Sequence, residues 1–443
     1  MRKREKVREA LKSLLLMVLI ASALTLTGRT WITDAGVTDS ASLAWLRAAM
    51  EFTSLGGEPP LPLASAGEKA EFHPASWPVS ACVTKSALHR GISRDTAAVG
   101  LLYDRAHDQL GVALGTAEDA VSLTRKGWET LLSLDGVFFE FPYAVPTRAL
   151  AAWLRVDAAP ALCANVASLA LVDDGDALLL LIRSGEGALW RYKTAMAFDP
   201  ALLSGTPAGA ECRFAFEWPD RPPLLDADAL LFGGTPQATL ARTAPAEDLD
   251  GLSEAVLRKL GFSILTTPYL TGDGTQIYVD NTRAYTLSIS PRGELVYRNP
   301  GGADPGRTQD EASPGERLPA ENALYEARCI EQARALLDTI SAWQGEARTP
   351  LSFAGWNGNR FFVRFSYELN GLPVDLPAAC EAFFENGALV EGRLYVRALF
   401  STDEPATLLP EERAAAVTAG GRFGLMYFRE DGDLLTPDWA SQP

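Results

Sequence analysis

The sequence of 443 residues has few of the side chains that enzymes commonly use for proton transfer and nucleophilic attack. It contains three histidines, His73, His89 and His107, and no H-E-x-x-H pair that would hold zinc. It also lacks a G-x-S-x-G elbow, an S-x-x-K motif and a phosphate-binding loop with a Walker lysine. The sequence therefore offers no recognisable centre for hydrolysis, and we predict no catalytic residue, no metal and no cofactor.

Cysteine is also scarce, and no C-x-x-C motif is present. The odd number and the wide spacing of the cysteines are not typical of a disulfide scaffold. We predict small buried residues with at most one disulfide pair, because unpaired cysteine is among the most buried residue types. The five cysteines are Cys82, Cys163, Cys212, Cys329 and Cys380.

Positive charge is in deficit over the chain as a whole. Fifty-six acidic residues against 40 basic ones give a formal net charge of −16. Binding of nucleic acid requires a positive field, so we predict no nucleic-acid partner. Acidic pairs such as Asp173-Asp174 and Asp431 with Asp433 lie beside glycine, where aspartate favours turns, and we interpret them as turn residues.

The N-terminus, in contrast, is basic and then apolar. The first twelve residues, MRKREKVREALK, hold six Lys or Arg and two Glu, and the uncharged run SLLLMVLIASALTLTG follows at 13–28. A run of this length falls between the core of a signal peptide and a spanning helix. Cleavage near residues 21–23 is one alternative. A retained helix that reaches Ile32, with Trp31 at the interface, is the other, and we favour it.

An anchor of this kind gives the chain one orientation. The positive-inside rule places residues 1–12 in the cytoplasm and 13–32 across the cell membrane as a single span, with the bulk of the chain extracellular. The apolar residues of the predicted anchor are Leu14, Leu15, Leu16, Met17, Val18, Leu19, Ile20, Leu24 and Leu26. Small or hydroxylated residues suit helix pairing in lipid, and the candidates are Ala21, Ser22, Thr25 and Gly28.

Turn-rich segments divide the rest of the chain. Stretches rich in Gly and Pro lie at 56–68, 218–226, 233–248 and 300–319. We predict an N-terminal α+β domain at 33–225, a middle domain at 226–305 and a C-terminal domain at 306–443. In each domain a helical pattern, at 147–154, 252–261 and 321–343, comes before a meander of strands. In the third helix the predicted core residues are Leu324, Ala327, Ile330, Leu337, Ile340 and Trp343.

Two stretches show the strand pattern clearly. In YVDNTRAYTLSISPRGELVYRN (278–299), Tyr285, Leu287 and Ile289 alternate with Thr and Ser, which is typical of a sheet with one buried face. FFVRFSYEL (361–369) repeats the alternation, and Asn370-Gly371 supplies a hairpin turn. The aromatic residues Tyr278, Tyr285, Tyr297, Phe361, Phe365 and Tyr367 allow a peptide- or glycan-binding face, but we interpret those on the apolar face as core.

The order of these motifs resembles one family. PYLTGDGTQIYVDN, YTLSISPRGELVYRN, a long helix, RFFVRFSYELNGLPVD, FFENGALVEGRLYV and a terminal MYF with TPDW are similar to YycH, and the C-terminal part also to the related YycI. Residues 110–154 resemble the N-terminal region of clostridial-type YycH-like proteins. The resemblance implies a membrane-anchored regulator of an essential cell-envelope sensor histidine kinase, with PepSY-like ectodomain units and a YycI-like partner.

Two functions from different classes follow. The first is a non-catalytic, extracellular regulator of a two-component sensor histidine kinase, acting through its transmembrane helix and its ectodomain. The alternative is an extracytoplasmic PepSY-like peptidase inhibitor or a module that binds cell-wall fragments. Retention of the N-terminal helix would separate them, because a diffusing inhibitor does not need an anchor. An enzyme is a third reading, for which the residues assemble no site.

Overall fold

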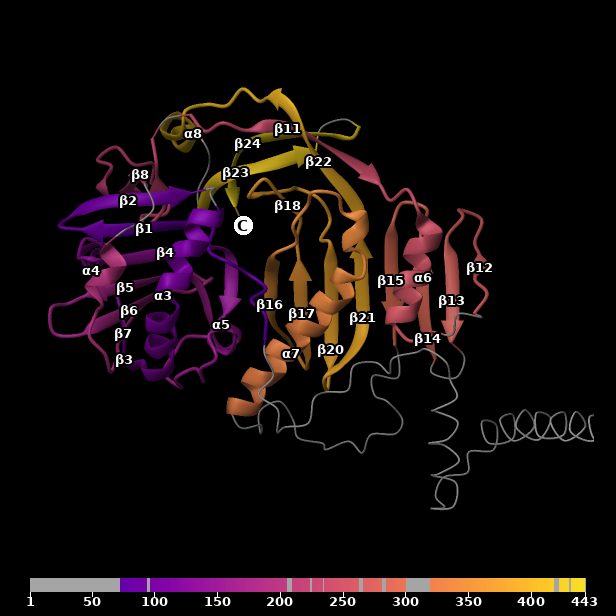
Figure 1. Cartoon of the computed structure of the whole chain (residues 1–443), viewed down its shortest axis with the longest axis horizontal. Coiled ribbons are helices and arrows are strands. Elements are labelled where there is room, and N and C mark those ends of the chain that lie inside the picture. The colour runs from indigo at the N-terminus through magenta and orange to yellow at the C-terminus, as the bar shows by residue number, and fades with distance from the viewer. Residues whose placement is uncertain are drawn as a thin grey trace, which may run out of the picture. The chain divides into compact units, whose positions relative to one another are not determined.

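The computed structural model describes residues 72–93, 96–204, 209–223, 225–233, 235–262, 266–280, 284–299, 319–417, 422–429 and 432–442. The described residues form six α-helices and antiparallel sheets, which agrees with the predicted α+β class (Figure 1). All of them fall within one unit that begins at Pro59.

The first large sheet has eight antiparallel strands in the order β3-β7-β6-β5-β4-β1-β2-β8. The strands are β1 (Ser80–Lys85), β2 (Leu88–Ser93), β3 (Glu118–Ser122), β4 (Gly136–Pro146), β5 (Asn165–Asp173), β6 (Leu178–Arg183), β7 (Leu189–Lys193) and β8 (Ala210–Glu211). The interior strand β6 reads LLLLIR and is buried along most of its length. A continuous apolar run of this kind suits a strand with both faces covered.

Helices cover both faces of this sheet. The helices α3 (Thr96–Thr116) and α5 (Thr147–Trp153) pack on one face. The helix α4 (Arg125–Leu132) covers the other face together with residues 212–232, through Trp128 and Phe214. The predicted helix at 147–154 and the three strands that follow it, β5, β6 and β7, are confirmed.

The second large sheet also has eight antiparallel strands, in the order β12-β13-β14-β15-β21-β20-β17-β16. They are β12 (Tyr269–Leu270), β13 (Gln276–Asp280), β14 (Tyr285–Ile289), β15 (Glu294–Arg298), β16 (Leu351–Asn357), β17 (Arg360–Phe365), β20 (Cys380–Glu385) and β21 (Ala388–Tyr395). In the middle of the sheet β15 pairs with β21, with Tyr297 opposite Gly392. The middle meander and the C-terminal strands therefore share one sheet.

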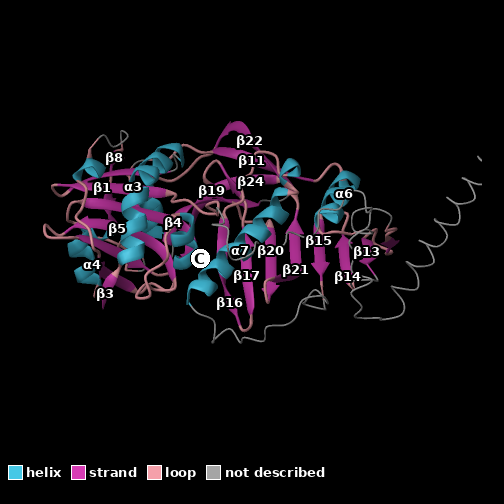
Figure 2. Ribbon diagram, turned by 60° about the horizontal axis from the view of Figure 1, so that its bottom comes forward, coloured by secondary structure: helices cyan, strands magenta, loops and turns pink. Residues whose placement is uncertain are grey.

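Two helices, α6 (Leu249–Lys259) and α7 (Pro319–Asp338), pack on this sheet (Figure 2). Among the core residues predicted for the helix at 321–343, which corresponds to α7, four are buried: Ala327, Ile330, Leu337 and Ile340. Leu324 is exposed, so its prediction is wrong. At 100° per residue Leu324 points away from Ala333, which is at the centre of the buried stripe. The helix ends at Asp338 rather than at 343, and a short 3₁₀ turn follows at Ser341–Trp343.

A third sheet joins distant parts of the chain. Its order is β22 (Arg397–Pro405), β11 (Thr239–Pro245), β24 (Leu434–Gln442) and β23 (Arg422–Arg429), and α8 (Glu411–Val417) lies between β22 and β23 in sequence. Two ribbons complete the fold: β9 (Arg213–Phe214) with β10 (Leu230–Leu231), and β18 (Glu368–Leu369) with β19 (Leu372–Pro373). The predicted turn at Asn370-Gly371 connects the second ribbon, with φ of 54° and 75°.

Strand pairing crosses both predicted domain boundaries. The ribbon of β9 and β10 spans the boundary at 225/226, because Leu230 lies opposite Phe214. The pairing of β15 with β21 spans the boundary at 305/306. The boundaries therefore do not separate sheets. Division of the chain into segments that fold independently stays a prediction.

Candidate interaction site

The second large sheet has one face packed under helices, and no helix of the described residues packs on its other face. On β17, Phe361, Val363 and Phe365 are buried, whereas the alternate residues Phe362 and Arg364 are half-buried and exposed. Because successive side chains of a strand point to opposite faces, the second set lies on the side away from α7. We call this side the open face of the sheet.

Three phenylalanine rings form a row across the open face. Phe353 of β16, Phe362 of β17 and Phe383 of β20 lie on adjacent strands, with ring centroids 5.5 Å and 4.5 Å apart in that order. The Phe353 ring lies close to Gly355, since a Cβ on that glycine would come within 3.2 Å of the ring. Phe353 keeps 45% of its surface exposed. We call these three residues the phenylalanine row.

Three ion pairs lie around the row, and they contribute as many positive as negative charges. They join Arg364 to Glu381 and Arg393 to Glu391, each at 2.9 Å, and Arg360 to Glu385 at 3.3 Å. The Arg364 guanidinium also lies 5.1 Å from the centre of the Phe362 ring. Exposed pairs of this kind add little to stability. They make the face locally neutral on a chain whose formal net charge is −16.

From the sequence, six aromatic residues allowed a binding face, and those on the apolar face were interpreted as core. Five of the six are buried, and Tyr285 is half-buried against Phe262 and Tyr297. The phenylalanine row was missed. The available signal was the doubled phenylalanine in FFVRF and in AFFE, since two adjacent rings on one strand must point to opposite faces.

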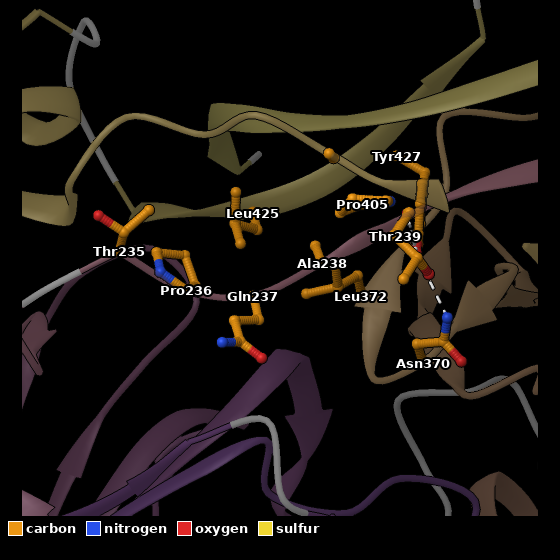
Figure 3. A pocket seen from close by; sticks show the side chains of 11 residues that line it. Thr235, Pro236, Gln237, Ala238, Thr239, Asn370, Leu372, Pro405, Leu425 and Tyr427 are labelled. Carbon is orange, nitrogen blue, oxygen red and sulfur yellow. Dashed lines mark hydrogen bonds between the residues drawn. The ribbon is translucent and has the colours of Figure 1, made fainter. Parts of the chain in front are cut away.

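A pocket of about 760 Å³ lies near the third sheet (Figure 3). None of the residues that line it is charged. Its polar groups bind one another: the Asn370 Nδ2 donates to the Tyr427 hydroxyl at 3.3 Å, and that hydroxyl donates to the Thr239 carbonyl at 3.0 Å. The pocket is therefore lined by uncharged side chains.

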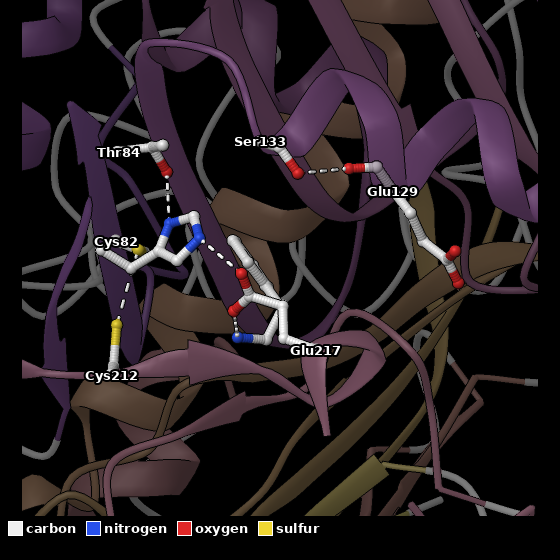
Figure 4. A network of polar contacts seen from close by, with 8 residues as sticks. Cys82, Thr84, Glu129, Ser133, Cys212 and Glu217 are labelled. Carbon is white, nitrogen blue, oxygen red and sulfur yellow. Dashed lines mark hydrogen bonds and ion pairs between the residues drawn. The ribbon is translucent and has the colours of Figure 1, made fainter. Parts of the chain in front are cut away.

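A hydroxyl, an imidazole and a carboxylate lie in line in the first sheet (Figure 4). The Thr84 hydroxyl is 2.8 Å from His89 Nδ1, and His89 Nε2 is 3.0 Å from Glu217 Oε1. This order matches that of a hydrolase triad. However, Thr84 and His89 are buried, and neither pocket described in the chain includes any of the three residues.

The three residues instead connect two parts of the chain. The second oxygen of Glu217, Oε2, accepts the backbone N–H of Phe214 at 2.9 Å. Glu217 thereby holds the 3₁₀ turn at Ala215–Glu217 against β2 through His89. Because the Thr84 hydroxyl and the His89 ring are buried and each group of the network has a partner, we assign this network a structural role.

The other two histidines are far from this network. His73 Nδ1 contacts Glu331 at 3.0 Å, and His107 contacts the adjacent Asp108 at 3.3 Å. Over the residues that the structure describes, no group of three His, Cys, Asp or Glu side chains is arranged to hold a metal ion. The turn interpretation of Asp173 is confirmed, because its Oδ1 accepts the backbone N–H of Gly175 at 2.9 Å.

A second polar cluster holds the segment that follows β9. Arg183 of β6 forms ion pairs with Asp226 and, at 3.1 Å, with Asp228. Burial raises the pKa of the Asp228 carboxyl, and the positive charge of Arg183 opposes that shift. The Oδ2 atom of Asp228 is buried without a hydrogen-bond partner. The cluster therefore holds residues 226–228 against the first sheet, but the burial of its charged groups away from water costs free energy.

Comparison with known proteins adds one similarity. No protein-family model matches the chain, and no curated protein matches it. Among solved structures the chain is similar to the crystal structure of YycH from Bacillus subtilis, with a TM-score of 0.47 and 9% sequence identity. The similarity covers 85% of this chain and 95% of that chain.

The predicted membrane residues lie outside the described part of the chain. This applies to the apolar residues of the anchor from Leu14 to Leu26 and to the helix-pairing candidates Ala21, Ser22, Thr25 and Gly28. From residue 72 onward, none of the helices described combines the length and the apolar character of a membrane span.

Proposed function

We propose that this chain is an extracellular, non-catalytic regulator of a two-component sensor histidine kinase, anchored by its N-terminal segment. We further propose that the ectodomain contacts the kinase through the phenylalanine row. The observation that carries the proposal is the row itself, three aromatic rings gathered on a sheet face over which no helix of the described part of the chain packs. The resemblance to the YycH family and the basic, then apolar, N-terminus support the identity of the partner.

The chemistry of the face favours a folded protein as the occupant. Interfaces between proteins are enriched in aromatic residues and arginine, and their energy is concentrated in a few central side chains. The row supplies such a centre, and Arg360, Arg364 and Arg393 lie around it, each neutralised by a glutamate. A nucleic acid or an anionic lipid surface would instead select an excess of positive charge.

Regulation then depends on which kinase state the open face binds better. A ligand shifts a conformational equilibrium only by the difference in its affinity for the two states. Anchoring in the same membrane raises the effective concentration of the ectodomain near the kinase, so a modest contact suffices. The small residues of the anchor, Ala21, Ser22, Thr25 and Gly28, would allow a second contact between helices in the lipid.

The test uses the full-length chain recovered from native membranes after mild crosslinking. The variant carries Phe362→Gln and Phe383→Gln, which remove two rings without altering the buried face. The control carries Tyr269→Gln and Leu270→Gln, two exposed apolar residues at the edge of the same sheet. Loss of two central aromatic contacts should lower recovery of the kinase about tenfold or more, whereas the control should recover as much as the wild type.

Two results would contradict the proposal. Equal recovery of the kinase by the row variant and the wild type would remove the row from the interface. If the wild type recovered no kinase and the row variant lost binding to purified cell-wall fragments, the face would be a glycan-binding surface. Aromatic rings also stack on sugars, so that assay is run on the same two variants.

A further inference from the structure

Two cysteines that are 130 positions apart in sequence meet in the first sheet. Cys82 lies on β1 and Cys212 directly follows β8, and their sulfur atoms are 3.6 Å apart (Figure 4). A disulfide bond requires about 2.05 Å between the sulfurs. Two of the other three thiols contact oxygen: the Cys163 thiol donates to the Asn165 carbonyl at 3.3 Å, and the Cys380 thiol to the Ala333 carbonyl at 3.9 Å.

A glycine makes this meeting possible. Strand β2 lies between β1 and β8, and its Gly91 is the partner of both Cys82 and Ala210. A Cβ on Gly91 would come within 2.7 Å of the Cys212 sulfur, a distance that real Cβ atoms essentially never show. Because Gly91 has no side chain, the two sulfurs can approach each other across the middle strand.

We propose that Cys82 and Cys212 form a disulfide bond in the mature protein. This bond would join β1 to the segment 209–232, which covers one face of the first sheet. The chemical partner is a disulfide oxidant, either a thiol–disulfide oxidoreductase or a small-molecule disulfide. The inference is independent of kinase binding and shares with the proposed function only the extracellular location, where oxidising conditions allow such bonds to persist.

The reaction balances as two exchange steps. The Cys212 thiol, which is half-buried, loses its proton, and its sulfur attacks one sulfur of the oxidant. The oxidant's S–S bond breaks, and its first thiolate leaves and takes a proton. The sulfur of Cys82, after losing its own proton, then attacks the Cys212 sulfur and displaces the second thiolate. Two protein thiols become one disulfide, and the oxidant is reduced to two thiols.

The order of these events relative to folding follows from burial. Cys82 is completely buried, and its hydrogen bond with Cys212, together with that burial, raises its pKa well above the usual value. The thiolate is the reactive form, so Cys82 reacts slowly once the sheet is closed. The bond should therefore form while residues 209–232 are still docking, and it should resist reduction in the folded protein.

The experiment counts free thiols on the full-length chain taken from its native membrane. The protein is denatured in the presence of an alkylating reagent, with and without prior reduction, and measured by mass spectrometry. Of the five cysteines, three should be alkylated without reduction and all five after it. Proteolysis should yield a linked pair of peptides that contain Cys82 and Cys212.

Variants separate this pair from the other cysteines. Cys82→Ser should leave four alkylated thiols, because Cys212 loses its partner. The matched control Cys163→Ser should leave two, because the bond remains. Reduction of the wild type in denaturant followed by refolding under reducing conditions should lower Tm by about 5 °C, given the long loop that the bond closes.

One result would overturn the inference. This is alkylation of all five cysteines in the protein from native membranes, together with five free thiols after the purified chain has been unfolded and refolded with glutathione disulfide. The thiol count does not depend on recovery of the kinase. If the disulfide were absent, the proposed function would therefore be unaffected. Likewise, a chain that recovers no kinase but contains the linked peptides would support the bond alone.

Discussion

The rings of Phe362 and Phe383 stack across the neighbouring strands β17 and β20, with centroids 4.5 Å apart and planes inclined by 17°. Each of these residues is adjacent in sequence to a ring in the core, Phe361 or Phe384. The alternation of a strand places one ring of each pair under α7 and the other on the open face. The same residue type therefore has two roles in this sheet, and the two can be separated by mutation.

Replacing each ring of the adjacent pair Phe361 and Phe362 by alanine should give very different losses of stability. Phe361 is fully buried, so Phe361→Ala should lower the free energy of unfolding by about 3–5 kcal/mol. Phe362→Ala removes a half-buried ring and one stacked pair, and should lower it by about 1 kcal/mol. Urea unfolding followed by circular dichroism measures both. Equal losses would mean that the open face is covered in solution.

Removal of Arg183 should destabilise the chain strongly because it leaves two carboxylates in a buried setting. Arg183→Met should lower the free energy of unfolding by about 3–5 kcal/mol. Asp228→Asn added to it should recover part of this loss, because the most buried carboxylate is then neutral. The control is Arg258→Met in the exposed pair of Arg258 with Glu254, with an expected loss below about 1 kcal/mol. If the two arginine variants unfolded at the same urea concentration, the ion pairs of Arg183 would contribute nothing.

The stability of the chain should also depend on pH through Glu326 of α7. Burial raises the pKa of this carboxyl, and a hydrogen bond from Trp356 Nε1 to its Oε1, at 3.0 Å, opposes the shift. A raised pKa means that the folded chain favours the protonated form. The contribution of Glu326 to the stability of the folded chain is therefore complete below the unfolded-state pKa of about 4.3. It is lost as pH rises through the folded-state pKa.

Glu326→Gln keeps the hydrogen-bond acceptor and removes the titration. The variant should melt at a higher temperature than the wild type at pH 7, and the difference should shrink towards pH 4. Thermal unfolding between these two pH values measures the slope. The control is Glu254→Gln, the same substitution at a residue whose side chain is 64% exposed. A difference that grew as the pH was lowered would reverse the assigned sign.

Local structure could largely be predicted from the sequence, and long-range pairing could not. The alternation at 284–290 and 361–369 and the turn at Asn370-Gly371 depend on neighbouring residues, and the structure reproduces them. The pairing of β15 with β21 joins residues about a hundred positions apart, and that choice of partner leaves no local pattern. The same holds for β11, which joins strands near the C-terminus.

The candidate sites also combine features that could be predicted from neighbouring residues with features that depend on long-range strand pairing. The burial of Phe361, Val363 and Phe365 was predicted from period-2 spacing, whereas the stacking of Phe362 on Phe383 requires knowledge of which strands are neighbours. The contact of Cys82 with Cys212 likewise depends on a glycine in a third strand. Sequence reasoning limited the cysteines to at most one disulfide pair but had no means of choosing its members.

Site-specific photo-crosslinking in intact cells tests the central claim most directly. A photoreactive amino acid replaces Phe383 in the phenylalanine row, and in a second strain it replaces Leu88, a residue of β2 that is 70% exposed. Because Phe383 lies in the proposed contact, irradiation should join the first protein to the sensor histidine kinase and leave the second unlinked. Kinase adducts of equal yield from both positions, or from neither while the wild-type chain still recovers the kinase from membranes, would contradict the assignment of the open face as the binding surface.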